Sequence, residues 1–129
     1  MVREKVQDFL LKRGNFLALY YNLQVYKDVY QLVLLLFTYT RDFPKEYKYS
    51  LGEDIRRDSI ILVRSIYRAN KALDKREDLD NFLDDFEVLK FEIRLSKDLH
   101  ILSIGHFSEI SKLIETIGKE INGWKRSSL

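Results

Sequence analysis

The chain has 129 residues, of which 46% are hydrophobic and 33% charged, and its formal net charge is +2 at pH 7. The absence of cysteine excludes disulfides, thiolate zinc sites and a cysteine nucleophile. One proline and five glycines favour long helices over short strands and turns, and this length suits one compact domain. The longest apolar run, Leu32 to Phe37, is far shorter than the roughly 20 residues that cross a bilayer. Without a membrane or targeting segment, we expect a cytoplasmic protein that does not engage membranes.

The net charge hides an asymmetry along the chain. Met1 to Glu77 holds 15 basic and 10 acidic residues, whereas Asp78 to Leu129 holds 7 and 10. Charge separated in this way favours a polar field with one face attractive to anions.

Residues 1–24 form an N-terminal extension of uncertain structure. Val2, Val6 and Phe9 are spaced as on a short helix over Val2 to Arg13, which Gly14 would end. The bundle domain is predicted over residues 25–126.

The first long helix is predicted from Val25 to about Asp42. Pro44 pushes Phe43 out of the α region, so residues 43–49 are expected to form a loop. The helix carries two adjacent apolar stripes, which are wider than one intrachain seam requires: Val25, Val29, Leu32 and Leu36, and beside them Tyr26, Tyr30, Val33 and Phe37.

The second helix is predicted over Ser50 to Lys71. Ser50 and Glu53 have the spacing of a capping box, in which the Ser50 hydroxyl accepts from the Glu53 amide. Its core stripe, with Ser59 filling one gap, is predicted to comprise Leu51, Ile55, Leu62, Ile66, Ala69 and Leu73. A cationic ridge is predicted on a different face of the same helix: Arg57, Arg64, Arg68, Lys71 and Lys75.

Two further helices complete the pattern. After a charged connection over Leu73 to Asp80, the third begins near Leu79, with Phe82, Phe86, Leu89 and Ile93 on its core side. Ser103 is a predicted N-cap, and the fourth helix carries an apolar residue every three or four positions from Phe107 to Trp124. Four helices joined by short connections predict an all-α, antiparallel up-down-up-down four-helix bundle.

The third helix carries a second basic row, Lys90, Arg94 and Lys97. Together with the ridge it is spaced to form one patch for the phosphates of a nucleic acid. The alternative is a solvated face, because Asp54, Asp58 and Asp74 offer nearby partners to the arginines.

No catalytic residues are predicted. His100 and His106 match no metal-binding spacing, the acidic pairs have no apolar pocket implied around them, and no phosphate loop or nucleophile elbow is present in the sequence. We therefore expect no metal, no cofactor and no enzymatic activity.

The apolar runs Leu32 to Phe37 and Ile60 to Val63 must expose hydrophobic groups outside a single core. A second copy of the chain would cover them, so a homo-oligomer is predicted. The alternative is that the N-terminal segment covers them.

Several motifs resemble the accessory variability determinant proteins (Avd) of diversity-generating retroelements, within the four-helix-bundle group that also contains proteins encoded in 23S ribosomal RNA intervening sequences. The matching motifs, over about residues 25–126, are Phe43-Pro44-Lys45, Ser50-Leu51-Gly52-Glu53, the run Arg94 to Leu99, Ile117-Gly118 and Gly123-Trp124. The intervening-sequence branch would end the second helix with an N-I-A-E-G-like run. Ser65 to Asn70 departs from it, which favours the Avd side.

The resemblance implies a homopentameric ring with a basic surface that binds the reverse transcriptase and template RNA, with DNA as a further candidate, during mutagenic cDNA synthesis. The basic positions that carry over are Arg56, Arg57, Arg64, Arg68, Lys90, Arg94 and Lys97, and the ridge adds Lys71 to this nucleic-acid-binding set. The alternative is a structural oligomeric bundle of the intervening-sequence type with protein or rRNA partners. An enzyme with an unrecognised bundle site is the third reading.

Overall fold

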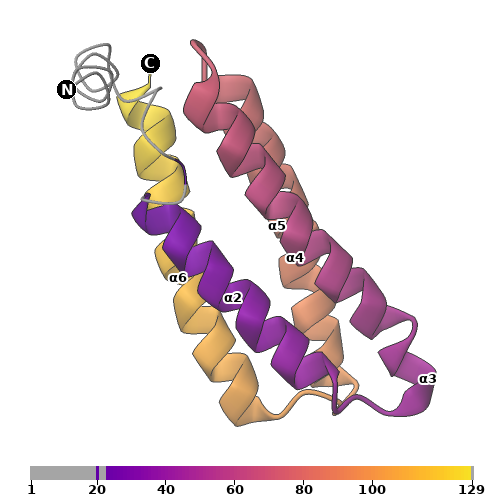
Figure 1. The fold of residues 1–129 in the computed structure, drawn as a ribbon. Coiled ribbons are helices and arrows are strands. Elements are labelled where there is room, and N and C mark those ends of the chain that lie inside the picture. The colour runs from indigo at the N-terminus through magenta and orange to yellow at the C-terminus, as the bar shows by residue number, and fades with distance from the viewer. Residues whose placement is uncertain (1–19, 21–22, 129) are drawn as a thin grey trace, which may run out of the picture.

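A computed structural model of the chain describes Tyr20 and residues 23–128, and every regular element in this part is helical. The helices are α2 (Gln24–Thr40), α3 (Lys45–Lys48), α4 (Leu51–Lys71), α5 (Arg76–Asp98) and α6 (Ile104–Ser127). Figure 1 shows α2 and α4 side by side at the near side of the molecule, with α6 behind α2 and α5 behind α4. The four long helices form the predicted four-helix bundle. The short helix predicted over residues 2–13 lies outside the described part.

The core follows the periodicity of the sequence. It is a single cluster that draws on all four long helices, and its largest side chains, among them Phe82 and Phe86, are fully buried. Ser59 is buried in the α4 stripe, as predicted, and Leu51 is half-buried. Leu73 contradicts the prediction, because it is 86% exposed. It lies beyond the end of α4, so the helical periodicity no longer applies to it.

The α3–α4 junction differs from the predicted loop and capping box. Residues 45–48 form a helical turn, and the Ser50 hydroxyl donates to the Glu46 carbonyl oxygen at 2.8 Å instead of accepting from the Glu53 amide. Because α3 ends only two residues earlier, its terminal carbonyls lack helical donors, and Ser50 supplies one.

The α4–α5 connection is shorter than predicted, because α5 begins at Arg76. Glu77 and Asp78 lie in its first turn, where carboxylates interact favourably with the helix dipole. The Asp74 carboxylate accepts from the Arg76 amide at 3.1 Å and so helps to start the helix. A dense run of charge therefore belongs to the helix rather than to the connection.

The α5–α6 connection has well-formed caps on both sides. Ser103 caps α6 as predicted, with its Oγ accepting from the His106 amide at 3.1 Å. His100 follows α5 with φ of 62°, while the Ile101 amide donates to the Ser96 carbonyl at 3.1 Å. This is a Schellman ending in which a histidine occupies the left-handed position usually taken by glycine.

Candidate nucleic-acid interface

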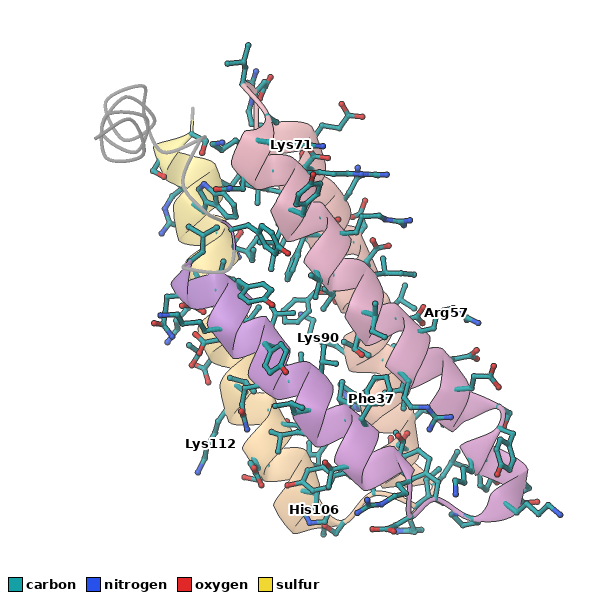
Figure 2. All side chains as sticks on the ribbon, in the orientation of Figure 1. Phe37, Arg57, Lys71, Lys90, His106 and Lys112 are labelled. Carbon is teal, nitrogen blue, oxygen red and sulfur yellow. The ribbon has the colours of Figure 1, made fainter. Side chains whose placement is uncertain are left out.

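The α4 ridge lies on the outside of the bundle. Arg57, Arg64, Arg68 and Lys71 are all exposed, opposite the buried stripe of Ile55, Leu62 and Ile66. Figure 2 shows Arg57 projecting from α4 away from the other helices. This placement follows from the helical period, since positions seven apart return to the same face.

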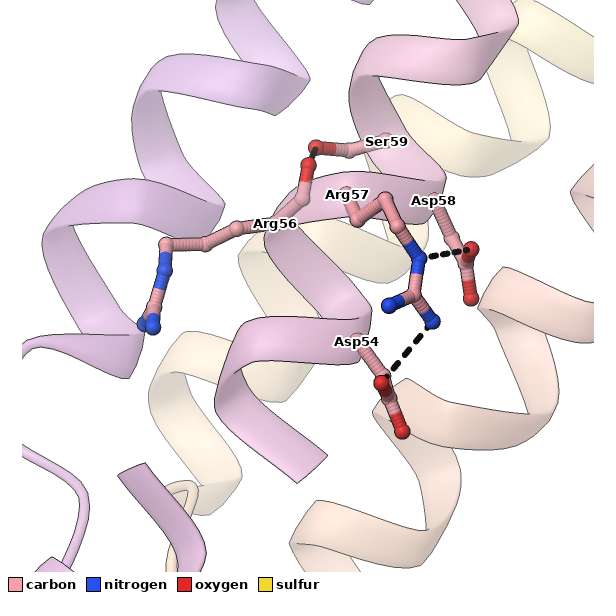
Figure 3. A network of polar contacts seen from close by, with 5 residues as sticks. All are labelled: Asp54, Arg56, Arg57, Asp58 and Ser59. Carbon is pink, nitrogen blue, oxygen red and sulfur yellow. Dashed lines mark hydrogen bonds and ion pairs between the residues drawn. The ribbon is translucent and has the colours of Figure 1, made fainter. Parts of the chain in front are cut away.

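Arg57 is engaged by acids of its own helix. Its guanidinium lies 2.9 Å from the Asp54 carboxylate and 3.7 Å from that of Asp58, as the dashed lines in Figure 3 mark. Its side chain is 61% exposed, so the pairs are solvated and each contributes little to stability. Among the ridge residues, Arg57 therefore fits best the alternative prediction of an ordinary solvated face.

Arg64 and Arg68 differ from Arg57. Both are exposed, and neither guanidinium makes an ion pair or hydrogen bond with any other described residue. The neighbouring Lys71 has its Nζ 4.4 Å from the centroid of the Tyr67 ring, an arrangement that leaves its charge in solvent. These three residues carry the exposed, uncompensated charge of the ridge.

Two residues predicted to be part of the basic surface instead make hydrogen bonds that stabilise the fold. The Arg56 guanidinium donates to Thr40 Oγ1 at 3.0 Å and to the Lys48 carbonyl at 3.1 Å, so it ties α4 to the ends of α2 and α3. In Figure 3 it points away from Arg57, across the helix. Since Arg56 lies between the core and outer faces, its guanidinium reaches these neighbours.

Lys75, predicted on the ridge, is only 7% exposed. Its Nζ donates to the carbonyls of Ala69, Asn70 and Ala72 at 2.8, 3.2 and 3.0 Å, and so caps the C-terminus of α4. Burial lowers the pKa of Lys75, and the charge of Asp78 partly opposes this. The ridge prediction failed here because the chain turns after Lys71, so the helical spacing ends before Lys75.

The second basic row does not lie on the side of α5 that faces α4. Lys90 pairs with Glu87 and has its Nζ 5.4 Å from the Phe86 ring centroid, and Lys97 lies 4.6 Å from the Phe107 ring of α6. Arg94 is 75% exposed, with its Nε 3.9 Å from Asp98. Lys90 and Lys97 border α6, since Lys90 lines a pocket together with Glu115 of α6, whereas the side of α5 toward α4 carries Asp85 and Glu92. The two rows do not merge into the single patch expected from the sequence.

The acidic side of α5 contains a buried carboxyl that sequence analysis missed. Glu92 is 7% exposed, its Oε1 has no hydrogen-bond partner, and Asp58 of α4 lies beside it. Burial, followed by hydrogen bonding with Asp58 and the charges of Asp58 and Asp54, raises the pKa of Glu92 from 4.5 to about 8, while Arg57 opposes the rise. Asp58 and Asp85 also line an adjacent cavity of about 60 Å³. The raised pKa favours the neutral, protonated form of Glu92 at the α4–α5 seam.

The opposite seam repeats this arrangement. Glu120 of α6 faces Asp28 of α2, and its Oε1 is likewise buried without a hydrogen-bond partner. Burial, then hydrogen bonding with Asp28 and its charge, raises the pKa of Glu120 to about 7. Each of the two helix pairs is thus joined by one carboxyl pair.

His106, in the first turn of α6, contacts α2. His106 stacks on Tyr39 with ring centroids 3.7 Å apart, and the Tyr39 hydroxyl donates to Glu109 at 2.8 Å. That hydrogen bond is the main cause of the raised pKa of Tyr39. Within residues 23–128, no three histidine or acidic side chains converge as metal ligands.

The fold and the exposed cations of α4 define the class: a four-helix-bundle protein with a row of exposed cations along the outside of one helix. Residues 23–128 match the model of the bAvd-like family, and because this match spans most of the chain, the protein belongs to that family. The match confirms the resemblance to accessory variability determinant proteins, a family of accessory proteins rather than catalysts. No curated protein matches the chain. None of the described helices is long and apolar enough to span a membrane.

Proposed function

We propose that this protein is a non-catalytic accessory subunit of a diversity-generating retroelement, and that it binds the reverse transcriptase and its template RNA through the exposed basic surface of α4. The observation that carries the RNA-binding part is the exposed guanidinium of Arg68. In a chain of the bAvd-like family, this guanidinium is exposed and has no partner among the described residues. Guanidinium groups without intramolecular acids are available to phosphates without first breaking an ion pair.

The working form in this proposal is a homopentamer. Five copies of 15.5 kDa give a mass of about 78 kDa, which light scattering separates readily from a monomer. Exposed apolar residues on α2 and α4, among them Tyr30 at 53% and Ile60 at 52%, support self-association.

The RNA-binding part is tested with a neutral substitution on the ridge, Arg68→Gln. RNA from the template repeat should bind the unmodified protein with an affinity that falls steeply as salt increases. Because the substitution removes one phosphate contact, it should lower the slope of log affinity against log salt by about 0.7 to 0.9. Lys112→Gln on α6 is the matched control, because it removes one exposed charge away from both basic rows. Binding that is insensitive to salt, or equally weakened by Lys112→Gln, would contradict a specific role for the ridge.

Binding of the reverse transcriptase is tested separately by co-elution of the two purified proteins in gel filtration. A complex that forms without RNA and survives high salt would indicate protein contacts. If no complex forms with or without RNA, the accessory role fails.

A further inference from the structure

Two exposed apolar faces lie on different sides of this bundle, and the residues around them carry opposite charges. The first, the α2–α4 groove, is formed by Tyr30, Leu34 and Phe37 of α2 and by Ile60 and Tyr67 of α4, which are 40 to 53% exposed. Figure 2 shows Phe37 on the near side, between α2 and α4. Half-buried Tyr26, Val33 and Val63 pack against the core beneath these residues, and Tyr20 packs edge-on against Tyr26 and Tyr67, with ring centroids 5.3 and 5.4 Å apart.

The margins of the α2–α4 groove are cationic on both sides. On α4, Arg64 lies one turn from Ile60 and Lys71 lies one turn from Tyr67. On α2, Lys27 and Arg41 are exposed and each is within one turn of a groove residue, Tyr30 and Phe37 respectively. The groove is therefore apolar along its centre and positive along its edges.

The second face is the α5 stripe, on the side of α5 that points away from the core. Val88 is 53% exposed, Phe91 66% and Leu99 38%, and Leu95 between them is half-buried. Asp84 lies one turn before Val88, and Glu87, which pairs with Lys90, lies one turn before Phe91. Asp84 is exposed and makes no ion pair with any described residue. This face is apolar along its centre and negative along the preceding turns.

One copy of the chain cannot bring these faces together, because the outer face of α4 lies between them. We propose that the α5 stripe of one copy docks into the α2–α4 groove of the next. Pairing a groove with a groove would oppose like charges, whereas a groove paired with a stripe buries two apolar faces and matches opposite charges. Such a contact is head-to-tail, and repeated contacts of this kind close into a ring when the rotation between copies allows it. The proposal rests on the self-association in the proposed function and assigns its surfaces.

The apolar half is tested with Phe37→Ser in the groove and Phe91→Ser in the stripe, using the full chain. Each should weaken self-association by about tenfold or more, the loss expected on truncating a central aromatic anchor. Leu73→Ser is the matched control, because Leu73 is 86% exposed and lies on neither face. The dissociation midpoint is measured by light scattering over a dilution series, and circular dichroism checks that each variant keeps its helicity.

The charge half is tested by reversal and rescue. Arg64→Glu with Lys71→Glu should dissociate the assembly, and so should Asp84→Lys with Glu87→Lys. Combining all four changes in one chain should restore assembly, because groove and stripe are again opposite in charge. A merely structural role for these residues would not produce rescue.

The outcomes separate this inference from the proposed function. An assembly unaffected by Phe37→Ser, Phe91→Ser and both reversals would overturn the interface while leaving an oligomeric accessory protein. A monomer at micromolar concentration would overturn both the self-association and the interface. In that monomer, the Phe37→Cys variant can be labelled with a thiol reagent. Slow labelling of the chain alone would mean that its own residues 1–19 cover the groove. Slow labelling only after addition of the reverse transcriptase would mean that the polymerase covers it.

Discussion

Replacing Glu92 by glutamine should remove a pH-dependent loss of stability. The raised pKa means that the folded chain holds a proton which the unfolded chain releases above pH 4.5. The stabilisation is therefore complete below that pH and is lost as pH rises through about 8. Glutamine keeps the shape of the side chain and stays neutral throughout.

The magnitude follows from the two pKa values. Each pKa unit corresponds to about 1.4 kcal/mol, so the rise from 4.5 to about 8 sets an upper limit of about 5 kcal/mol on the titration. About 3 kcal/mol of this should be lost between about pH 5 and pH 8. Glu92→Gln should thus resemble the unmodified protein at the acidic end and exceed its stability by up to about 3 kcal/mol at the alkaline end.

Urea denaturation followed by far-UV circular dichroism, at one fixed protein concentration and several pH values, measures this difference. Glu115→Gln is the matched control, since Glu115 is an exposed glutamate of α6 that pairs with Lys119 at 3.2 Å. Parallel pH curves for the unmodified protein and Glu92→Gln would refute the buried neutral acid. Glu120→Gln should show the same effect over a narrower window, because the pKa of Glu120 reaches only about 7.

Four further predictions concern the backbone and caps. Gly52→Ala should destabilise the fold by about 1 kcal/mol or more, because the added Cβ would lie 3.2 Å from the Tyr47 carbonyl oxygen. Gly118→Ala should stabilise the fold by about 0.5 to 1 kcal/mol, because the added Cβ would make only an ordinary contact with Phe86 at 3.9 Å. His100→Gly should raise the melting temperature, since it relieves about 1 kcal/mol of left-handed strain at φ 62°. Ser103→Ala should cost about 1 kcal/mol by removing the cap on the His106 amide. Thermal denaturation checks all four variants, and a melting temperature that moves in the opposite direction would contradict the reason given for that variant.

The sequence predicted the long helices and their buried stripes because the helical period alone determines which side chains face inward. Arg56 and Lys75 were wrongly predicted to lie on the basic surface. Their long side chains reach carbonyl groups near helix ends, and periodicity does not locate such acceptors.

The carboxyl pairs were missed although the sequence carries a signal for them. Asp28, Asp58, Glu92 and Glu120 each lie three residues after one core-side residue and four before another. An acid at such a position faces a seam rather than solvent. Which two acids meet depends on how neighbouring helices pack, and a single sequence does not specify this.

The fluorescence of Trp124 reports on the end of the bundle where Lys75 is buried. Trp124 is the only tryptophan of the chain, and its ring centroid lies 6.0 Å from the Lys75 Nζ, where the α4–α5 connection meets the last turns of α6. Its fluorescence should therefore follow detachment of this end of the bundle, while circular dichroism follows the helices as a whole. If iodide quenching of Trp124 rises at lower urea than the loss of helicity, the end opens as a unit before the rest unfolds.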